Sequence, residues 1–255
     1  MPTRSWLAKA DSIHDLGGHF YLPKPGETWD DAREERAEAK WLDRLKRPLP
    51  AGVESSKYFG SRMHDSWIMG VRRTDDALRV TLDRIWTYAF ARSMARVLEI
   101  EPVDARWPVD LVLHDPTCVR AARYDPRGTL RYADPYGFAA GERRGRDQFL
   151  YDWFFEEDGR LQWIADLWVP REPRQRLSAS VYLMVDCARA GAEDRSAQAL
   201  AGIYGVPAGR LYEDAVGDGG GERIDFDVWE SPTTEDYIRR RMAAHGFAKA
   251  DFRAG

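Results

Sequence analysis

The chain has 255 residues, of which 44% are hydrophobic and 31% are charged, an ordinary composition for a globular protein with a buried core. Its formal net charge of −4 argues against a dedicated nucleic-acid binder, because neutralising phosphates requires a basic face. No stretch approaches the ~18 consecutive apolar residues of a membrane helix, and residues 1–10 lack the apolar segment of a secretory signal. We therefore expect a cytoplasmic protein with no nucleic-acid or membrane partner.

The first thirty residues contain Gly17-Gly18 and Pro23-Lys24-Pro25-Gly26, and they predict an irregular or short-strand lead. From Asp30 to Arg47 a sparse apolar stripe predicts a helix, which Pro48 and Pro50 end. Charge covers most of its circumference, so we expect it on the outside of the core.

After Tyr58 the apolar residues alternate with polar ones on both sides of Thr74-Asp75-Asp76, which predicts two strands joined by an acidic turn. Apolar residues then recur at helical spacing, and this predicts one amphipathic helix near 85–99.

Further strands are expected at 109–113, 118–122, 148–156, 161–168 and 178–188. The run from Val181 to Val185 is apolar on both faces, which favours a central place in a sheet. Residues 191–255 look mainly helical, with a short helix over Gln198–Tyr204 that Gly205 and Pro207 end, and another over Tyr237–His245. A glycine loop at 217–221 separates the two helices.

These elements predict an α+β fold, with one mainly antiparallel sheet, a leading helix, one inserted helix and a helical C-terminal extension. We divide the chain into an N-terminal lead and helix (1–57), a β-rich core (58–190) and the extension (191–255), which together form one compact unit.

Two His-Asp doublets, His64-Asp65 and His114-Asp115, are the most suggestive chemical feature. In metal-dependent phosphohydrolases such a doublet ligates a metal from within a helical bundle, but here one precedes an alternating strand and the other ends one. The alternative is structural, with each Asp accepting backbone hydrogen bonds at a strand entry or turn. If the sheet brings the doublets within about 5 Å of each other, they form an acid–base or metal site.

Other candidate chemistry is weaker. Cys118 and Cys187 are too few for a disulfide framework or a four-cysteine zinc site, and they fit buried reduced thiols. His14 and His19 lack a third ligand nearby, and Glu156-Glu157-Asp158 precedes Gly159 as in a hairpin turn. No nucleophile-elbow, dinucleotide-binding or zinc-protease motif occurs, so we predict no catalytic residue outside the doublets, no metal and no cofactor.

The ten tryptophans and 32 arginines (38 basic residues less six lysines) suit a protein interface, where both types are enriched. Trp67, Arg72 and Arg79 lie near the expected entry hairpin and are our candidates for partner binding. The alternative is that Trp67 belongs to the core and the arginines only solvate a strand face.

Short motifs between residues 41 and 188 resemble a loose set of uncharacterised bacterial proteins, in which a helix precedes a His-Asp-Ser/Ala-x-Ile entry into a β-meander. The matching segments are Trp41-Leu42-Asp43-Arg44-Leu45 with Leu49-Pro50, His64-Asp65-Ser66-Trp67-Ile68, Leu78-Arg79-Val80-Thr81-Leu82, Phe149-Leu150-Tyr151-Asp152 and Val185-Asp186-Cys187. The resemblance implies an immunity-like role for some relatives, which bind and silence a toxin, and it brings no catalytic residues. The helix near 85–99 and residues 191–255 depart from the pattern.

Three functions remain open. The first is a non-catalytic, immunity-like protein that binds another protein and occludes it. The second is a metal-dependent or acid–base hydrolase that uses the two doublets. The third is an accessory subunit of a larger bacterial assembly, docked through residues 191–255.

Overall fold

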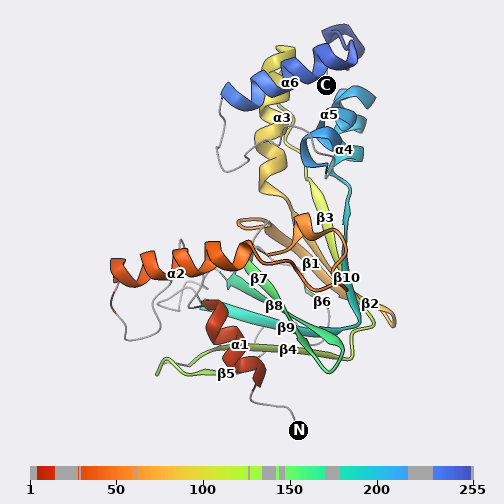
Figure 1. Ribbon diagram of the computed structural model, residues 1–255. Coiled ribbons are helices and arrows are strands. Elements are labelled where there is room, and N and C mark those ends of the chain that lie inside the picture. Colours follow the sequence, from red (N-terminus) through yellow and green to blue (C-terminus); the bar gives the residue numbers. More distant parts are fainter. Residues whose placement is uncertain are drawn as a thin grey trace. The chain divides into compact units, whose positions relative to one another are not determined.

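The computed structural model describes residues 5–14, 28, 30–60, 63–125, 127–133, 142–143, 147–169, 179–217 and 232–253. It confirms the α+β fold, because helices and a mainly antiparallel sheet both make up large parts of it (Figure 1). None of the described helices is both long enough and apolar enough to cross a membrane.

The described helices are α1 (Ser5–His14), α2 (Asp31–Leu45), α3 (Ile85–Leu98), α4 (Ser196–Tyr204), α5 (Val206–Val216) and α6 (Pro232–His245), with short 3-10 turns η2 (Ser56–Tyr58) and η4 (Lys249–Asp251). The described strands are β1 (Trp67–Arg73), β2 (Ala77–Asp83), β3 (Pro108–His114), β4 (Cys118–Tyr124), β5 (Leu130–Tyr132), β6 (Glu142–Arg143), β7 (Gln148–Glu157), β8 (Arg160–Val169), β9 (Ala179–Cys187) and β10 (Arg189–Asp194).

The chain divides into two compact units. The sheet unit comprises residues 1–82 and 110–193, and the helical unit comprises residues 83–109 and 194–255. This division does not follow the boundaries at 57 and 190 that we drew from the sequence. The inserted helix α3 belongs with the C-terminal helices, although about a hundred residues of sheet separate them in the chain.

The strands follow the order β10-β3-β2-β1-β7-β8-β9-β4-β5, and β6 also pairs with β1. The hairpin between β7 and β8 turns at Asp158 and Gly159, which both have positive φ angles (52° and 73°), as a two-residue type I′ turn requires. The run Val181–Val185 is buried on both faces between β8 and β4, which confirms its predicted central place.

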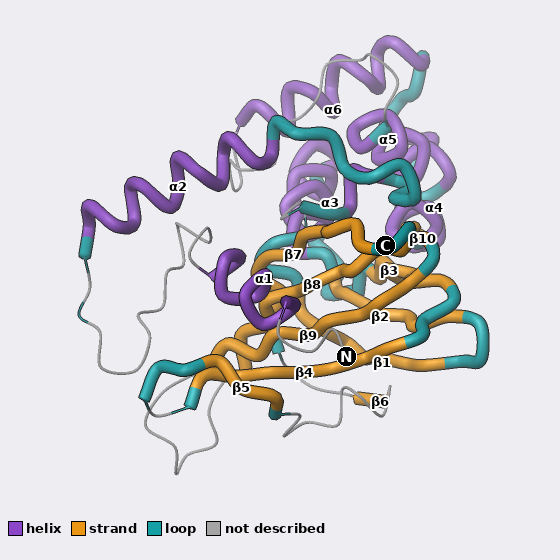
Figure 2. The backbone as a smooth tube through the Cα atoms, turned by 60° about the horizontal axis from the view of Figure 1, so that its bottom comes forward, coloured by secondary structure: helices purple, strands orange, loops and turns teal. Residues whose placement is uncertain are grey.

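Helix α1 lies along one face of the sheet, as Figures 1 and 2 both show. It buries Trp6, Ala10 and Ile13 against Ile164, Tyr182 and other side chains of that face. Around this contact Nε1 of Trp6 donates to the Tyr132 hydroxyl at 2.7 Å, and Nζ of Lys9 lies 2.8 Å from Glu157. The prediction of an irregular lead was therefore wrong at Ser5–His14. Only three apolar residues of this segment are buried, and the segment is helical because the sheet covers these three side chains.

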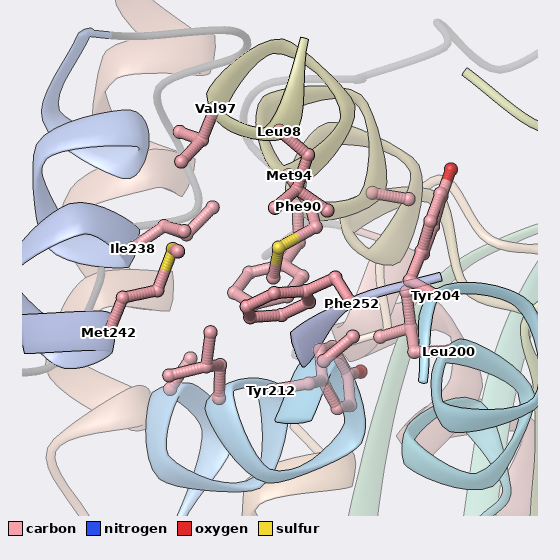
Figure 3. Packing of buried hydrophobic residues seen from close by; sticks show 14 of the residues in the cluster. Phe90, Met94, Val97, Leu98, Leu200, Tyr204, Tyr212, Ile238, Met242 and Phe252 are labelled. Atoms are coloured by element: carbon pink, nitrogen blue, oxygen red, sulfur yellow. The ribbon is translucent and has the colours of Figure 1, made fainter. Parts of the chain in front are cut away.

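The helical unit has its own core, shown in Figure 3. Phe90 and Met94 of α3 and Ile238 and Met242 of α6 point into the same interior, together with Tyr212 of α5. Helix α3 ends at Glu99, whose left-handed backbone (φ 60°) lets its N–H and that of Ile100 bond the last carbonyls.

Helix α5 was not expected from the sequence, where Gly205 and Pro207 looked like the end of a helix. Gly205, with φ 95°, does end α4, but Pro207 occupies the first turn of α5. A proline is accommodated there because the N–H groups of the first turn have no intrahelical acceptor, so the N–H that proline lacks is not missed. The helices over residues 85–99, 198–204 and 237–245 were predicted correctly in type and place. The predicted glycine loop lies, beyond Gly217, outside the described residues.

Two buried polar networks lie within the helical unit. The carboxylate of Asp83 accepts hydrogen bonds from the Trp107 amide (2.8 Å), Arg106 (2.7 Å) and the Tyr88 hydroxyl (3.0 Å). Nη1 of Arg84 donates to the hydroxyl of Tyr212 at 2.9 Å and lies 3.3 Å from Asp194. Buried charges require such partners, so these groups stabilise the ends of the segments that build the unit.

Candidate functional site

Strand β1 carries two of the three strongly exposed large hydrophobic side chains described in the sheet unit. Trp67 is 37% exposed and Met69 36%, and the only other large hydrophobics as exposed in the described residues are Tyr132 and Val206. The buried side chains of β1 are those of Ile68 and Val71, three positions apart. Trp67, Met69 and Arg72 are all exposed, and we call these three side chains the β1 surface.

Trp67 is aligned with two residues from much later in the chain. It pairs with Gln148 of β7, which in turn pairs with Trp168 of β8. Residues paired across antiparallel strands project from the same face, so these three side chains form a row across the sheet. Neighbouring strands lie about 4.8 Å apart, which places the two tryptophan positions about 10 Å from each other.

The first His-Asp doublet lies at the beginning of β1, next to this row. Nδ1 of His64 is 3.0 Å from Oδ2 of Asp65, and the other carboxylate oxygen accepts a hydrogen bond from Nε2 of Gln148 at 2.9 Å. Asp65 has a positive φ of 63°, and its N–H donates to the carbonyl of Phe149 at 2.8 Å. The ring of Tyr151 lies 4.9 Å from that of His64. The doublet thus fixes the chain where it enters β1 and orients the Gln148 amide.

The second doublet lies at the other end of β1. The N–H of Asp115, whose φ is 55°, donates to the carbonyl of Asp76 in the β1–β2 turn, and the carbonyl of Asp115 accepts from Nη2 of Arg160 at 2.7 Å. Seven extended strand residues separate the turn from Asp65, a distance of roughly 20 Å. The structure therefore does not bring His64 and Asp65 together with His114 and Asp115.

The three predicted binding residues differ in their surroundings. Trp67 and Arg72 are exposed on β1, whereas Arg79 of β2 forms a two-point pair with Glu193, at 2.7 and 3.0 Å. The hydrogen bond to Glu193 raises the pKa of Arg79 more than its partial burial lowers it, and Asp110 at 3.7 Å adds to the effect. A guanidinium held in this way is less available to a partner than one that is fully exposed.

Neither cysteine is in a disulfide. Burial, followed by the charge of Asp186, raises the pKa of the Cys187 thiol to about 12, so Cys187 stays protonated and unreactive. Cys118 is only partly buried, at a position of β4 that pairs with Asp186.

The remaining candidates from the sequence form no metal-binding cluster in the described part of the chain. No three His, Cys, Asp or Glu side chains there are close enough to hold a metal ion. Glu157 is paired with Lys9, and Asp158 is in the β7–β8 turn. His14 is the last residue of α1, and His19 lies outside the described residues.

Sequence inspection missed Met69 of the β1 surface, and it missed Gln148 and Trp168 of the row that includes Trp67. Met69 was visible only as one position of an alternating strand. Gln148 and Trp168 could have been placed beside Trp67 only from the strand register, because 81 and 101 positions separate them from it in the chain.

Comparison of the chain with family models, curated proteins and solved structures finds no match. The resemblance to bacterial immunity-like proteins therefore stays a prediction from the sequence.

Proposed function

We propose that this chain is a non-catalytic, immunity-like protein that binds another protein and occludes it. The observation that carries the proposal is the exposure of Trp67 and Met69 on one strand, beside Arg72. Trp, Met and Arg are enriched at protein interfaces, where a few such side chains supply most of the binding energy.

The surroundings of Trp67 support the same function. Gln148 and Trp168 continue the row over two further strands, and both are partly exposed, although Trp168 also packs against the core that includes Trp6 of α1. The hydrogen bond that Gln148 donates to Asp65 fixes the Gln148 amide, which lowers the entropy cost of using this amide in a contact. A rigid sheet that presents aromatic side chains in register is a suitable surface for a partner protein.

The two other functions have less support. A hydrolase built from both doublets needs them close together, and they lie at opposite ends of β1. An accessory subunit docked through residues 191–255 needs an apolar surface there, and among the described residues of that segment Val206 is the one large hydrophobic that is strongly exposed (77%). For its location we propose the cytoplasm of a bacterial cell, which suits the two free cysteines.

The test is a comparison of three tagged chains: the native one, the Trp67→Ser/Met69→Ser double variant and a Val206→Ser control. Val206 is strongly exposed, so the control should unfold within about 0.5 kcal/mol of the native chain. Trp67 and Met69 are only about a third exposed, so the double variant loses some buried apolar area, and circular dichroism must first show that it is folded. We expect one stoichiometric partner to co-purify with the native chain and the control, and to be lost from the double variant.

The partner is then purified and titrated against the three chains by calorimetry. A 1:1 complex that the double variant weakens by tenfold or more supports the proposal. If no protein co-purifies from gentle, low-salt lysates, or if the double variant binds as tightly as the control, the proposal is wrong.

A further inference from the structure

We draw no further inference here: the strongest candidate, the row of Trp67, Gln148 and Trp168 across strands β1, β7 and β8 of the sheet, belongs to the surface already proposed for a partner, and nothing in the structure shows what covers it.

Discussion

Nε2 of His245, in the last turn of α6, lies 2.6 Å from Oδ2 of Asp214 in α5. The same oxygen accepts hydrogen bonds from Nε and Nη2 of Arg241. Burial by itself would raise the pKa of Asp214, but the hydrogen bonds from His245 and Arg241 outweigh it, so this pKa lies below its ordinary value. One carboxylate therefore connects two helices of the helical unit.

Replacing Asp214 by Asn should destabilise the helical unit by about 1–3 kcal/mol at neutral pH, because the charge-assisted hydrogen bonds are lost. A carboxyl whose pKa is lowered by folding contributes stability above the ordinary pKa of about 3.9, and this contribution disappears as the pH falls through the lower, folded value. Urea unfolding followed by circular dichroism should show the native chain and Asp214→Asn converging towards acid pH.

The matched control is Asp236→Asn. Asp236 is exposed and pairs at 3.1 Å with Arg239 on its own helix, so its loss should change the unfolding free energy by less than about 0.5 kcal/mol. An Asp214→Asn effect that is no larger than this, or that is the same at every pH, would show that the cluster does not stabilise the unit.

Gly209 of α5 should not tolerate a methyl group. A Cβ there would lie 2.6 Å from the carbonyl oxygen of Ala197 and 3.0 Å from the Cβ of Ala201, both in α4. We expect Gly209→Ala to destabilise the protein by about 1–3 kcal/mol, because the two helices must move apart. Thermal unfolding measures the change.

Gly202 of α4 provides the opposite case, since a Cβ there meets no atom within 4 Å. Gly202→Ala should stabilise the protein by about 0.5–1 kcal/mol through its higher helix propensity. A shift of the melting temperature in the same direction for both substitutions would contradict the close packing of α4 against α5 at Gly209.

The hydroxyl of Tyr88 should ionise at a higher pH than an ordinary tyrosine. Burial, and then the neighbouring charge of Asp83, raise its pKa to about 12. Because folding raises the pKa of this group, its stabilising contribution is complete below the ordinary tyrosine value of about 10 and is lost as the pH rises through the folded value. We expect Tyr88→Phe to reduce the loss of stability at alkaline pH, measured by urea unfolding across this range.

Spectroscopic titration provides a second check on Tyr88. Asp83→Asn removes the carboxylate that accepts a hydrogen bond from the Tyr88 hydroxyl at 3.0 Å. The ultraviolet titration of Tyr88 should therefore move to lower pH. The Tyr88 signal is identified as the one absent from the Tyr88→Phe chain. A Tyr88 titration unchanged by Asp83→Asn would contradict the role assigned to the carboxylate.

The two His-Asp doublets should act independently. His64 and His114 lie at opposite ends of β1, so the destabilisations caused by His64→Ala and His114→Ala should add in the double variant within about 0.5 kcal/mol. Denaturant unfolding of the native chain, the two single variants and the double variant measures the coupling. A coupling above about 1 kcal/mol would show that the doublets share one site after all.

Much of the architecture was predictable because its causes are local. Alternating apolar residues predicted β1 and β2, and the run Glu156-Glu157-Asp158 before Gly159 predicted the hairpin turn between β7 and β8. The apolar stripe and the prolines after it predicted α2 to within two residues at either end. Each of these signals depends on backbone preference and periodicity over fewer than about 15 residues.

The failures also have physical causes. Helix α1 has ten residues, too few to be stable alone, and its formation depends on the sheet that buries Trp6 and Ile13. Pro207 was interpreted as the end of a helix, but prolines occur both just after a helix and in the first turn of the next one. The local sequence does not distinguish these two positions. The separation of the doublets could not be inferred, because it depends on which strands lie next to each other.

The sequence by itself determined the fold class, most of the strands and the presence of Trp67 and Arg72 on an alternating segment. Only the tertiary structure decided that Trp67 is exposed in register with Gln148 and Trp168, that Arg79 is held by Glu193, and that α3 belongs with the C-terminal helices. The reason is that secondary structure depends on near neighbours in the chain, whereas strand register and side-chain partners depend on packing between segments that are distant in sequence.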